Sequence, residues 1–245
     1  MPAVAVALRK ANSLRLRVVI ASFRIGSRLL SWVGFAYVAL RFPALGPGIR
    51  EYSRNGGKGD IWQYRRVMDL ARLISRRQPN HIVELGSGVS TLAFKHFAKE
   101  RGARVSSFES DRSWAEVTVR ACSTANVSPD FIFADRLVAQ DGVYYATPIP
   151  SDADFIYVDG PDARVEGRLV PCIDVLHALE AGIRPATIIV SQRHATVSAL
   201  CSFNILREEY DFLPSADYSL ERRNLMAALL FRRHTQFLKK AAVPA

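Results

Sequence analysis

Two patterns of hydrophobic and polar positions alternate along most of the chain. Short and almost wholly apolar runs predict buried β-strands at residues 81–85, 105–108, 131–134, 155–158, 187–190 and 225–231. Apolar residues that recur every three or four positions predict helices over residues 60–77, 91–99, 113–125, 169–181 and 195–206. Buried strands that alternate with helices predict an α/β fold with a doubly wound, mostly parallel sheet covered on both faces.

Residues 8–40 give a further helical pattern, in which a basic and polar face lies opposite an apolar one. Its longest uncharged run, residues 29–40, is 12 residues long, whereas about 20 are needed to cross a bilayer. We expect this helix to lie on an anionic membrane surface, or else to pack on the main domain or on another subunit. Proline and glycine then predict a linker, at Pro43, Gly46, Pro47 and Gly48.

The positive charge is concentrated at the N-terminus. The chain has 245 residues and a formal net charge of +10, and residues 1–50 hold eight basic residues and no acidic ones. The other residues carry 25 basic against 23 acidic side chains, and this near-neutral composition argues against nucleic acid as a partner. We therefore divide the chain into a basic segment, residues 1–50, and a main domain, residues 51–245.

Cysteine usage indicates the compartment. The three cysteines lie far apart in sequence and form no C-x-x-C pair, which argues against a disulfide framework or a zinc ribbon. We expect a cytoplasmic protein, either free or peripheral on the inner face of a membrane.

Two neighbouring crossovers carry the candidate chemistry. The first predicted strand ends in Glu84-Leu85-Gly86-Ser87-Gly88 and leads into a helix. A glycine turn before a helix presents free backbone N–H groups and lets a ligand approach the main chain closely. The second strand ends at Glu109, where a carboxylate can accept hydrogen bonds from both hydroxyls of a ribose. Together the two features predict a ligand that contains adenosine, although a solvated loop carboxylate is the alternative for Glu109.

The chain resembles the class I S-adenosylmethionine-dependent methyltransferases over roughly residues 60–232. Residues 84–91 look like the first motif of that family, residues 108–111 like the acidic end of its second strand, 133–135 like the segment that approaches adenine, and 154–161 like the fourth-strand motif beside the acceptor. The resemblance implies a seven-stranded sheet in the order 3-2-1-4-5-7-6 with its last strand antiparallel. It also implies S-adenosylmethionine as cofactor, held by Glu84, Gly86, Ser87, Gly88, Ser90, Thr91, Glu109, Ser110, Asp135 and Asp159.

A hydroxyl acceptor requires a base to remove its proton. Asp159 is the first candidate, because it ends the fourth strand at the switch point of the sheet; a structural carboxylate that holds the next turn is the alternative. His194, just after the fifth strand, is the second candidate base, with an exposed loop histidine as the alternative. Some relatives of this fold bind a divalent metal with a carboxylate pair after the fifth strand. Ser191-Gln192-Arg193 stands there in this chain, so we expect no catalytic metal.

Residues 159–168 contain the turn residues of a loop over the site. Their Asp-Gly-Pro and Gly-Arg pattern resembles that of methyltransferases acting on uronic acids in plant polysaccharides. Arg164 and Arg168 are candidates for binding an acceptor carboxylate or phosphate, with a solvated arginine or a salt bridge to Glu166 as the alternative.

The function that this sequence predicts is O-methylation of a sugar, a lipid-linked acceptor or a small metabolite, by a chain that can form a homo-oligomer. Two other functions stay open. One is a non-catalytic, membrane-peripheral adaptor that keeps the methyltransferase fold. The other is a nucleic-acid methyltransferase, against which the absence of an Asn-Pro-Pro-Tyr type motif argues.

Overall fold

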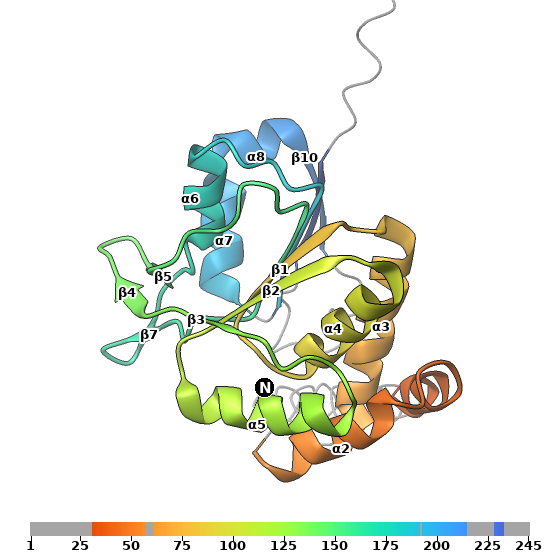
Figure 1. Cartoon of the computed structure of the whole chain (residues 1–245). Coiled ribbons are helices and arrows are strands. Elements are labelled where there is room, and N and C mark those ends of the chain that lie inside the picture. The colour runs from red at the N-terminus through yellow and green to blue at the C-terminus, as the bar shows by residue number, and fades with distance from the viewer. Residues whose placement is uncertain (1–30, 57–60, 192, 215–227, 233–245) are drawn as a thin grey trace, which may run out of the picture.

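Seven strands form the central sheet in the part of the chain that the computed structural model describes, which is residues 31–56, 61–191, 193–214 and 228–232 (Figure 1). From one edge to the other, they are β3 (Ile132–Phe133), β2 (Arg104–Glu109), β1 (His81–Leu85), β6 (Phe155–Val158), β9 (Thr187–Val190), β11 (Ala228–Arg232) and β10 (Tyr210–Pro214).

Five of these strands, from β3 to β9, pair in parallel, which confirms the expected α/β fold with a mainly parallel sheet. Strand β11 lies antiparallel to both β9 and β10. Numbered by their order along the chain within this sheet, the strands run 3-2-1-4-5-7-6. The apolar pattern placed β11 a few residues early and missed β10, a short strand that follows a helix directly and ends in Pro214.

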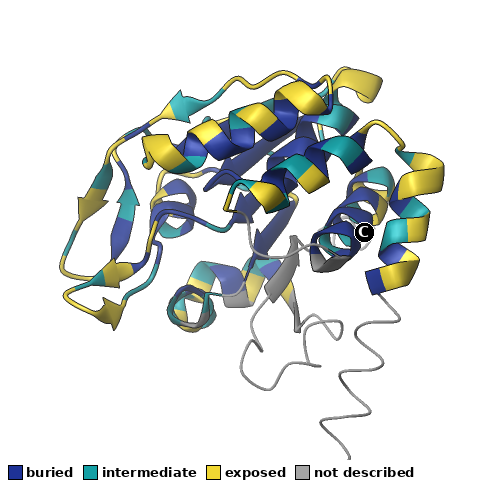
Figure 2. Cartoon of the chain, turned by 90° about the horizontal axis from the view of Figure 1, so that it is seen from below, coloured by how far each residue is buried: buried dark blue, intermediate teal, exposed yellow. Residues whose placement is uncertain are grey.

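The sheet is apolar on both faces because each face packs against its own layer of helices. In β6, Phe155 and Tyr157 belong to one core cluster, while Ile156 and Val158 belong to the other. Successive side chains of a strand point to opposite faces, so a strand covered on both sides, such as β6, is apolar on both faces. Figure 2 shows the central strands buried between helices with exposed outer sides.

The first cluster is covered by α2 (Leu45–Arg54), α3 (Ile61–Arg77), α4 (Val89–Arg101) and α5 (Arg112–Thr124). The second is covered by α6 (Asp174–Glu180), α7 (His194–Ser202) and α8 (Asn204–Glu209).

Two of the predicted helices differ from those observed. The helix expected over residues 169–181 begins only at Asp174, because β8 (Arg168–Leu169) pairs with β7 (Arg164–Val165) in a hairpin. The helix expected over residues 195–206 is interrupted at Phe203, whose backbone is extended. A second hairpin joins β4 (Arg136–Val138) and β5 (Val143–Tyr145).

The linker prediction holds only for Pro43, which lies in the turn between the helix of residues 31–41 and α2. It is wrong for Gly46, Pro47 and Gly48, which lie inside α2, where Leu45 and Ile49 are fully buried in the first cluster. A Cβ on Gly48 would lie 2.6 Å from the Ala121 carbonyl oxygen of α5. Glycine therefore serves here for a close helix contact rather than for flexibility.

Residues 31–41 are helical, in agreement with the end of the pattern expected over residues 8–40; residues 1–30 lie outside the described part of the chain. This helix packs on α3, since a Cβ on Gly34 would lie 2.6 Å from the Cα of Arg65. Among the described residues, no helix has both the length and the apolar character needed to cross a membrane.

Gly48→Ala is expected to destabilise the fold by about 2 kcal/mol, because the added methyl has no room between α2 and α5. Gly46→Ala is the matched control in the same helix, since beyond its chain neighbours a Cβ there meets only the end of the Arg50 side chain, at 3.8 Å. Alanine should change stability there by less than about 1 kcal/mol, because its higher helix propensity is offset by the contact of its Cβ with the ring of Pro47. Denaturant unfolding measures both effects, and equal stability of the two variants would contradict the packing described here.

Candidate functional site

The turn after β1 touches the end of β6 through backbone atoms. Gly86 has a φ of +90°, a conformation that favours glycine, and a Cβ at this position would lie 2.5 Å from the backbone nitrogen of Gly160. A Cβ on Gly160 would likewise meet the Cα of Gly86. No side chain fits between the two loops, so the ends of the first and fourth predicted strands form one continuous wall.

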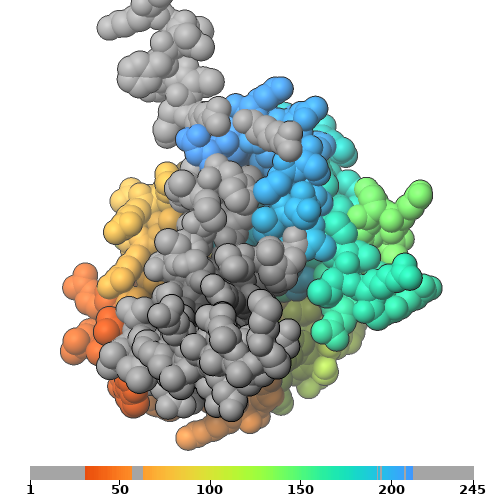
Figure 3. Space-filling view, turned by 180° about the vertical axis from the view of Figure 1, so that it is seen from behind, coloured from red at the N-terminus to blue at the C-terminus, as the bar shows by residue number. Residues whose placement is uncertain are grey.

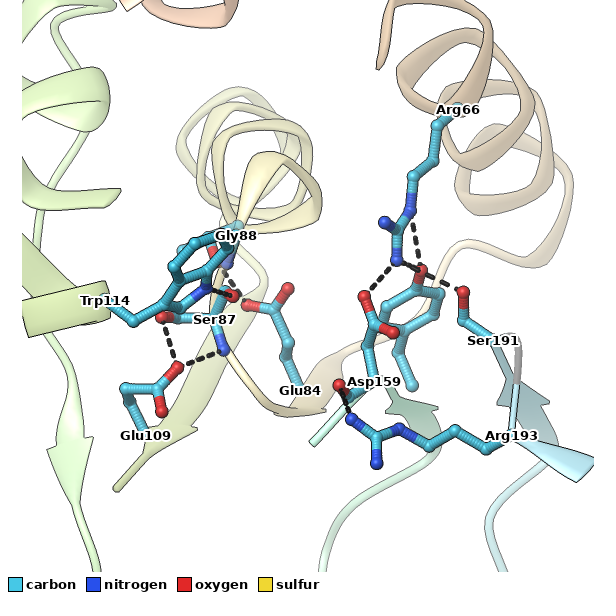
Figure 4. A network of polar contacts seen from close by, with 11 residues as sticks. Arg66, Glu84, Ser87, Gly88, Glu109, Trp114, Asp159, Ser191 and Arg193 are labelled. Carbon is cyan, nitrogen blue, oxygen red and sulfur yellow. Dashed lines mark hydrogen bonds and ion pairs between the residues drawn. The ribbon is translucent and has the colours of Figure 1, made fainter. Parts of the chain in front are cut away.

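Glu109 joins the first crossover to the second. One carboxylate oxygen, Oε2, accepts hydrogen bonds from the Ser87 backbone N–H at 3.0 Å and from the Ser87 hydroxyl at 2.7 Å. The other, Oε1, accepts from the backbone N–H groups of Ser110 at 2.8 Å and Asp111 at 3.0 Å. The glycine turn and the acidic end of the second strand, which the sequence predicted to act together, are therefore in direct contact (Figure 4).

Glu84 is fully buried behind the glycine turn. Its Oε2 accepts hydrogen bonds from the hydroxyls of Thr91 at 2.7 Å and Ser107 at 2.8 Å. Its Oε1 is buried and has no hydrogen-bond partner among the described residues. Burial raises the pKa of Glu84 to about 7, although the surrounding hydroxyls favour the charged form. One oxygen of this buried carboxylate therefore lacks a hydrogen-bond partner among the described residues, while the nearby Ser90 hydroxyl also favours its charged form.

Thr91 and Ser90 lie in the first turn of α4. The Thr91 hydroxyl accepts a hydrogen bond from the Gly88 backbone N–H at 2.9 Å while it donates to Glu84. Both hydrogen bonds of the Thr91 hydroxyl are therefore made within the segment from Glu84 to Thr91. Ser90 is buried at the same helix end.

Two aromatic side chains that the sequence analysis did not assign to the site border the glycine turn. The Trp114 indole N–H donates to the Ser87 carbonyl oxygen at 2.8 Å, and Figure 4 shows its ring over the turn. Trp114 lies at an apolar position of its helix, a pattern that by itself indicates a core residue. Tyr52 packs edge-on against Trp114, with ring centroids 5.8 Å apart, and a Cβ on Gly88 would lie 3.1 Å from its hydroxyl oxygen. Tyr52 comes from α2, next to the segment misread as a linker.

Arg66 of α3 organises the other half of the site. Its guanidinium forms an ion pair with Oδ2 of Asp159 and donates to the Tyr157 hydroxyl at 2.9 Å and to the Ser191 hydroxyl at 3.2 Å. Asp159 directly follows β6, and its carboxylate is oriented by an arginine 93 residues away in sequence.

Arg193 fixes the loop after β6 from the opposite side. It donates to the carbonyl oxygen of Asp159 and to that of Pro161 at 2.6 Å. A pocket of about 280 Å³ opens between this loop, the β7–β8 hairpin and the start of α7, and its polar lining consists of Asp159, Asp162, Arg164, Ser191, Arg193 and Thr196. The candidate base and one of the two candidate substrate arginines thus line the same pocket.

The remaining predicted site residues lie on β8, between β3 and β4, and at the start of α7. Arg168 is exposed on β8 and does not line the described pocket. Asp135 is exposed between β3 and β4. His194 is the first residue of α7, and its role as a base stays a prediction, as do the cofactor contacts of Asp135 and Ser110. Among the residues that the structure describes, no cluster of histidine, cysteine, aspartate and glutamate could hold a metal ion.

No protein-family model matches the chain, and no curated protein matches it. Several solved structures, however, match the chain. A Klebsiella pneumoniae protein assigned as an O-methyltransferase aligns with a TM-score of 0.53 at 16% identity, over 85% of this chain and 99% of that one. A methyltransferase from Podospora anserina, bound to SAH, aligns with a TM-score of 0.51 at 15% identity, over 81% and 93%. An O-methyltransferase from Bacillus cereus in complex with SAH aligns with a TM-score of 0.50 at 14% identity, over 81% and 96%.

These similarities show which fold the chain has. The chain has the Rossmann-like fold of the class I S-adenosylmethionine-dependent methyltransferases, as the sequence resemblance implied. At this level of identity the comparisons concern the fold, and the activity has to be argued from the site.

Glu84→Gln is expected to change how stability depends on pH. A carboxyl whose pKa is raised in the folded state favours folding below its unfolded pKa, near 4.5, and loses that contribution as the pH rises through about 7. The stability of the wild type relative to the variant should therefore fall by roughly 3 kcal/mol across this interval. Denaturant unfolding at several pH values measures the difference. Glu116→Gln, at an exposed position of α5, controls for net charge, and parallel pH curves for wild type and Glu84→Gln would contradict the assignment.

Proposed function

We propose that this protein is an S-adenosylmethionine-dependent methyltransferase that transfers a methyl group to a hydroxyl oxygen of a small-molecule or glycan acceptor. The observation that carries the proposal is the hydrogen-bonded contact between Ser87 and Glu109, which joins the two crossovers beside the open oxygen of Glu84. Its membrane association and its state of assembly stay predictions at this point.

The residues around the glycine turn fit such a cofactor chemically. The unpartnered Oε1 of Glu84 suits a cationic amino group, because a buried carboxylate is stabilised by a charged donor. The contact between Gly86 and Gly160 brings the ends of β1 and β6 together, so that the proposed cofactor and acceptor sites adjoin. When bound, S-adenosylmethionine supplies a methyl group on a sulfonium, which needs alignment with the acceptor rather than covalent help.

Ribose binding by Glu109 requires an exchange of hydrogen bonds. A carboxylate has about four acceptor sites, and four protein donors already occupy them. Three are backbone N–H groups fixed by the fold, whereas the Ser87 hydroxyl can rotate away. We infer that a ribose hydroxyl replaces the Ser87 hydroxyl on Glu109, and that the three backbone donors keep the carboxylate in place.

The pocket beside Asp159 is the proposed acceptor site. As the acceptor oxygen forms its bond to the methyl carbon and the carbon–sulfur bond breaks, the hydroxyl proton passes to a base. Asp159 is the proposed base, since its Oδ1 carries no hydrogen bond among the described residues while Arg66 holds Oδ2. Arg66 acts as a positioning residue, and Arg164 on the pocket wall suits an acidic group of the acceptor.

Calorimetry with S-adenosylmethionine tests the cofactor site. The wild type should show saturable binding, and Glu109→Gln should weaken it at least about tenfold, because a charge-assisted acceptor of the ribose is lost. Ser87→Ala is the matched variant: it removes the competing hydroxyl and should leave affinity unchanged or improved. Absence of saturable heat in a folded wild type would overturn the proposed function, and weaker binding by Ser87→Ala would overturn the exchange.

Transfer of labelled methyl groups into acceptor extracts tests the activity. The wild type should label a hydroxyl compound, and Asp159→Asn should reduce the rate by about a hundredfold or more while it retains cofactor binding. Labelling of nucleic acid instead would contradict the acceptor class. Saturable cofactor binding without any labelled product would favour the non-catalytic adaptor.

A further inference from the structure

The helix of residues 31–41 is apolar on its outer side as well as on its inner side. Trp32, Val33 and Leu40 are 60%, 51% and 81% exposed, and Ala36 and Ala39 are exposed between them. At 100° per residue these five positions form one continuous stripe, which we call the outer face. Exposed apolar side chains that form a stripe, unlike scattered ones, indicate a surface that binds a partner.

The inner side of the helix is occupied by the body of the protein. Gly34 lies against the α3 backbone, Phe35 packs edge-on against Tyr64 with ring centroids 5.0 Å apart, and Val38 is fully buried. The helix is therefore held in place by one face. Its outer face is not needed for packing against the described elements.

Exposed positive charges accompany the outer face, on the same helix and on the two helices that follow it along the chain. In residues 31–56 and 61–77, the exposed charged side chains are all arginines: Arg41, Arg50, Arg54, Arg72, Arg76 and Arg77. The two acidic residues of these ranges are part-buried and engaged, Glu51 by the Asn55 side-chain amide at 2.7 Å and Asp69 by Arg65 at 3.7 Å. Arg72 of α3 lies over the ring of Tyr37, which belongs to the helix of residues 31–41, with its guanidinium carbon 4.9 Å from the ring centroid. The segment before the helix adds six basic and no acidic residues.

We propose that the outer face binds an anionic lipid membrane surface, with Trp32 and Leu40 in the headgroup region and the arginines beside lipid phosphates. A helix that combines an apolar stripe with flanking cations is the arrangement that such a surface attracts. Nucleic acid would use the arginines but leave the stripe in water. A second copy of the chain is disfavoured, because like charges would face one another and a short helix offers far less than the ~1,200 Å² of a stable interface.

Vesicle flotation with the full chain tests the proposal. The wild type should bind vesicles of phosphatidylcholine with one third phosphatidylglycerol and should not bind pure phosphatidylcholine vesicles. Trp32→Ser with Leu40→Ser should reduce partitioning at least about tenfold, and Arg41→Gln should reduce it roughly fivefold at low salt. Trp32→Phe should still bind but should lose most of the blue shift in tryptophan emission that accompanies binding.

Leu169→Ser is the matched control. Leu169 is 62% exposed and lies in the β7–β8 hairpin, on the opposite side of the molecule from the N-terminal helices (Figure 3). This variant should bind vesicles like the wild type. Equal partitioning of the wild type and the Trp32→Ser, Leu40→Ser variant would overturn the proposal. A lack of vesicle binding combined with RNA binding, or an effect of the variant on oligomeric state alone, would also overturn it. The experiment measures no methyl transfer, so its result is independent of the proposed activity.

Discussion

The contact between Gly86 and Gly160 is the constraint on which the site depends. Parallel pairing of β1 with β6 brings the carboxyl ends of the two strands to one edge, and only residues without side chains allow the loops that follow to touch. This contact fixes the distance between Ser87 and Glu109 on one side and Asp159 on the other. A site that must align two reactants depends on such a fixed wall, because small displacements reduce rates strongly.

Charge is arranged differently in the two halves of this wall. Around Asp159, an arginine holds the carboxylate and a second arginine holds the backbone of the same residue, so the negative charge is neutralised and fixed in position. Around Glu84, only hydroxyls approach the carboxylate and one oxygen lacks a donor. The charge of the Asp159 carboxylate is therefore paired within the protein, whereas among the described residues the Glu84 carboxylate lacks an ion pair and one hydrogen bond.

The sequence predicts those parts of the site that follow directly from a strand. Glu84 lies one residue before the end of its predicted strand, whereas Glu109 and Asp159 come directly after theirs, and in a parallel sheet such ends meet at one edge. Arg66 could not be found in this way, because on an amphipathic helix it reads as a solvated charge and its pairing with Asp159 spans 93 residues. Tyr52 was hidden for another reason. In the sequence alone, the glycine and proline residues of α2 resemble those of a linker. Only the position of α5 shows that a side chain at residue 48 would clash with the neighbouring helix.

The incomplete half of the site links folding to ligand binding. A buried carboxylate with an open oxygen destabilises the folded chain whenever it is charged, and Glu84, with a pKa of about 7, is partly charged near neutral pH. A cationic ligand that donated a hydrogen bond to this oxygen would remove the penalty. The free energy by which charged Glu84 destabilises the free protein would then be regained on binding and would strengthen the affinity for that ligand. The same carboxylate disfavours neutral or anionic ligands at this position. Under the proposed function, selectivity for a positively charged cofactor would therefore follow from a polar group that the fold leaves unsatisfied.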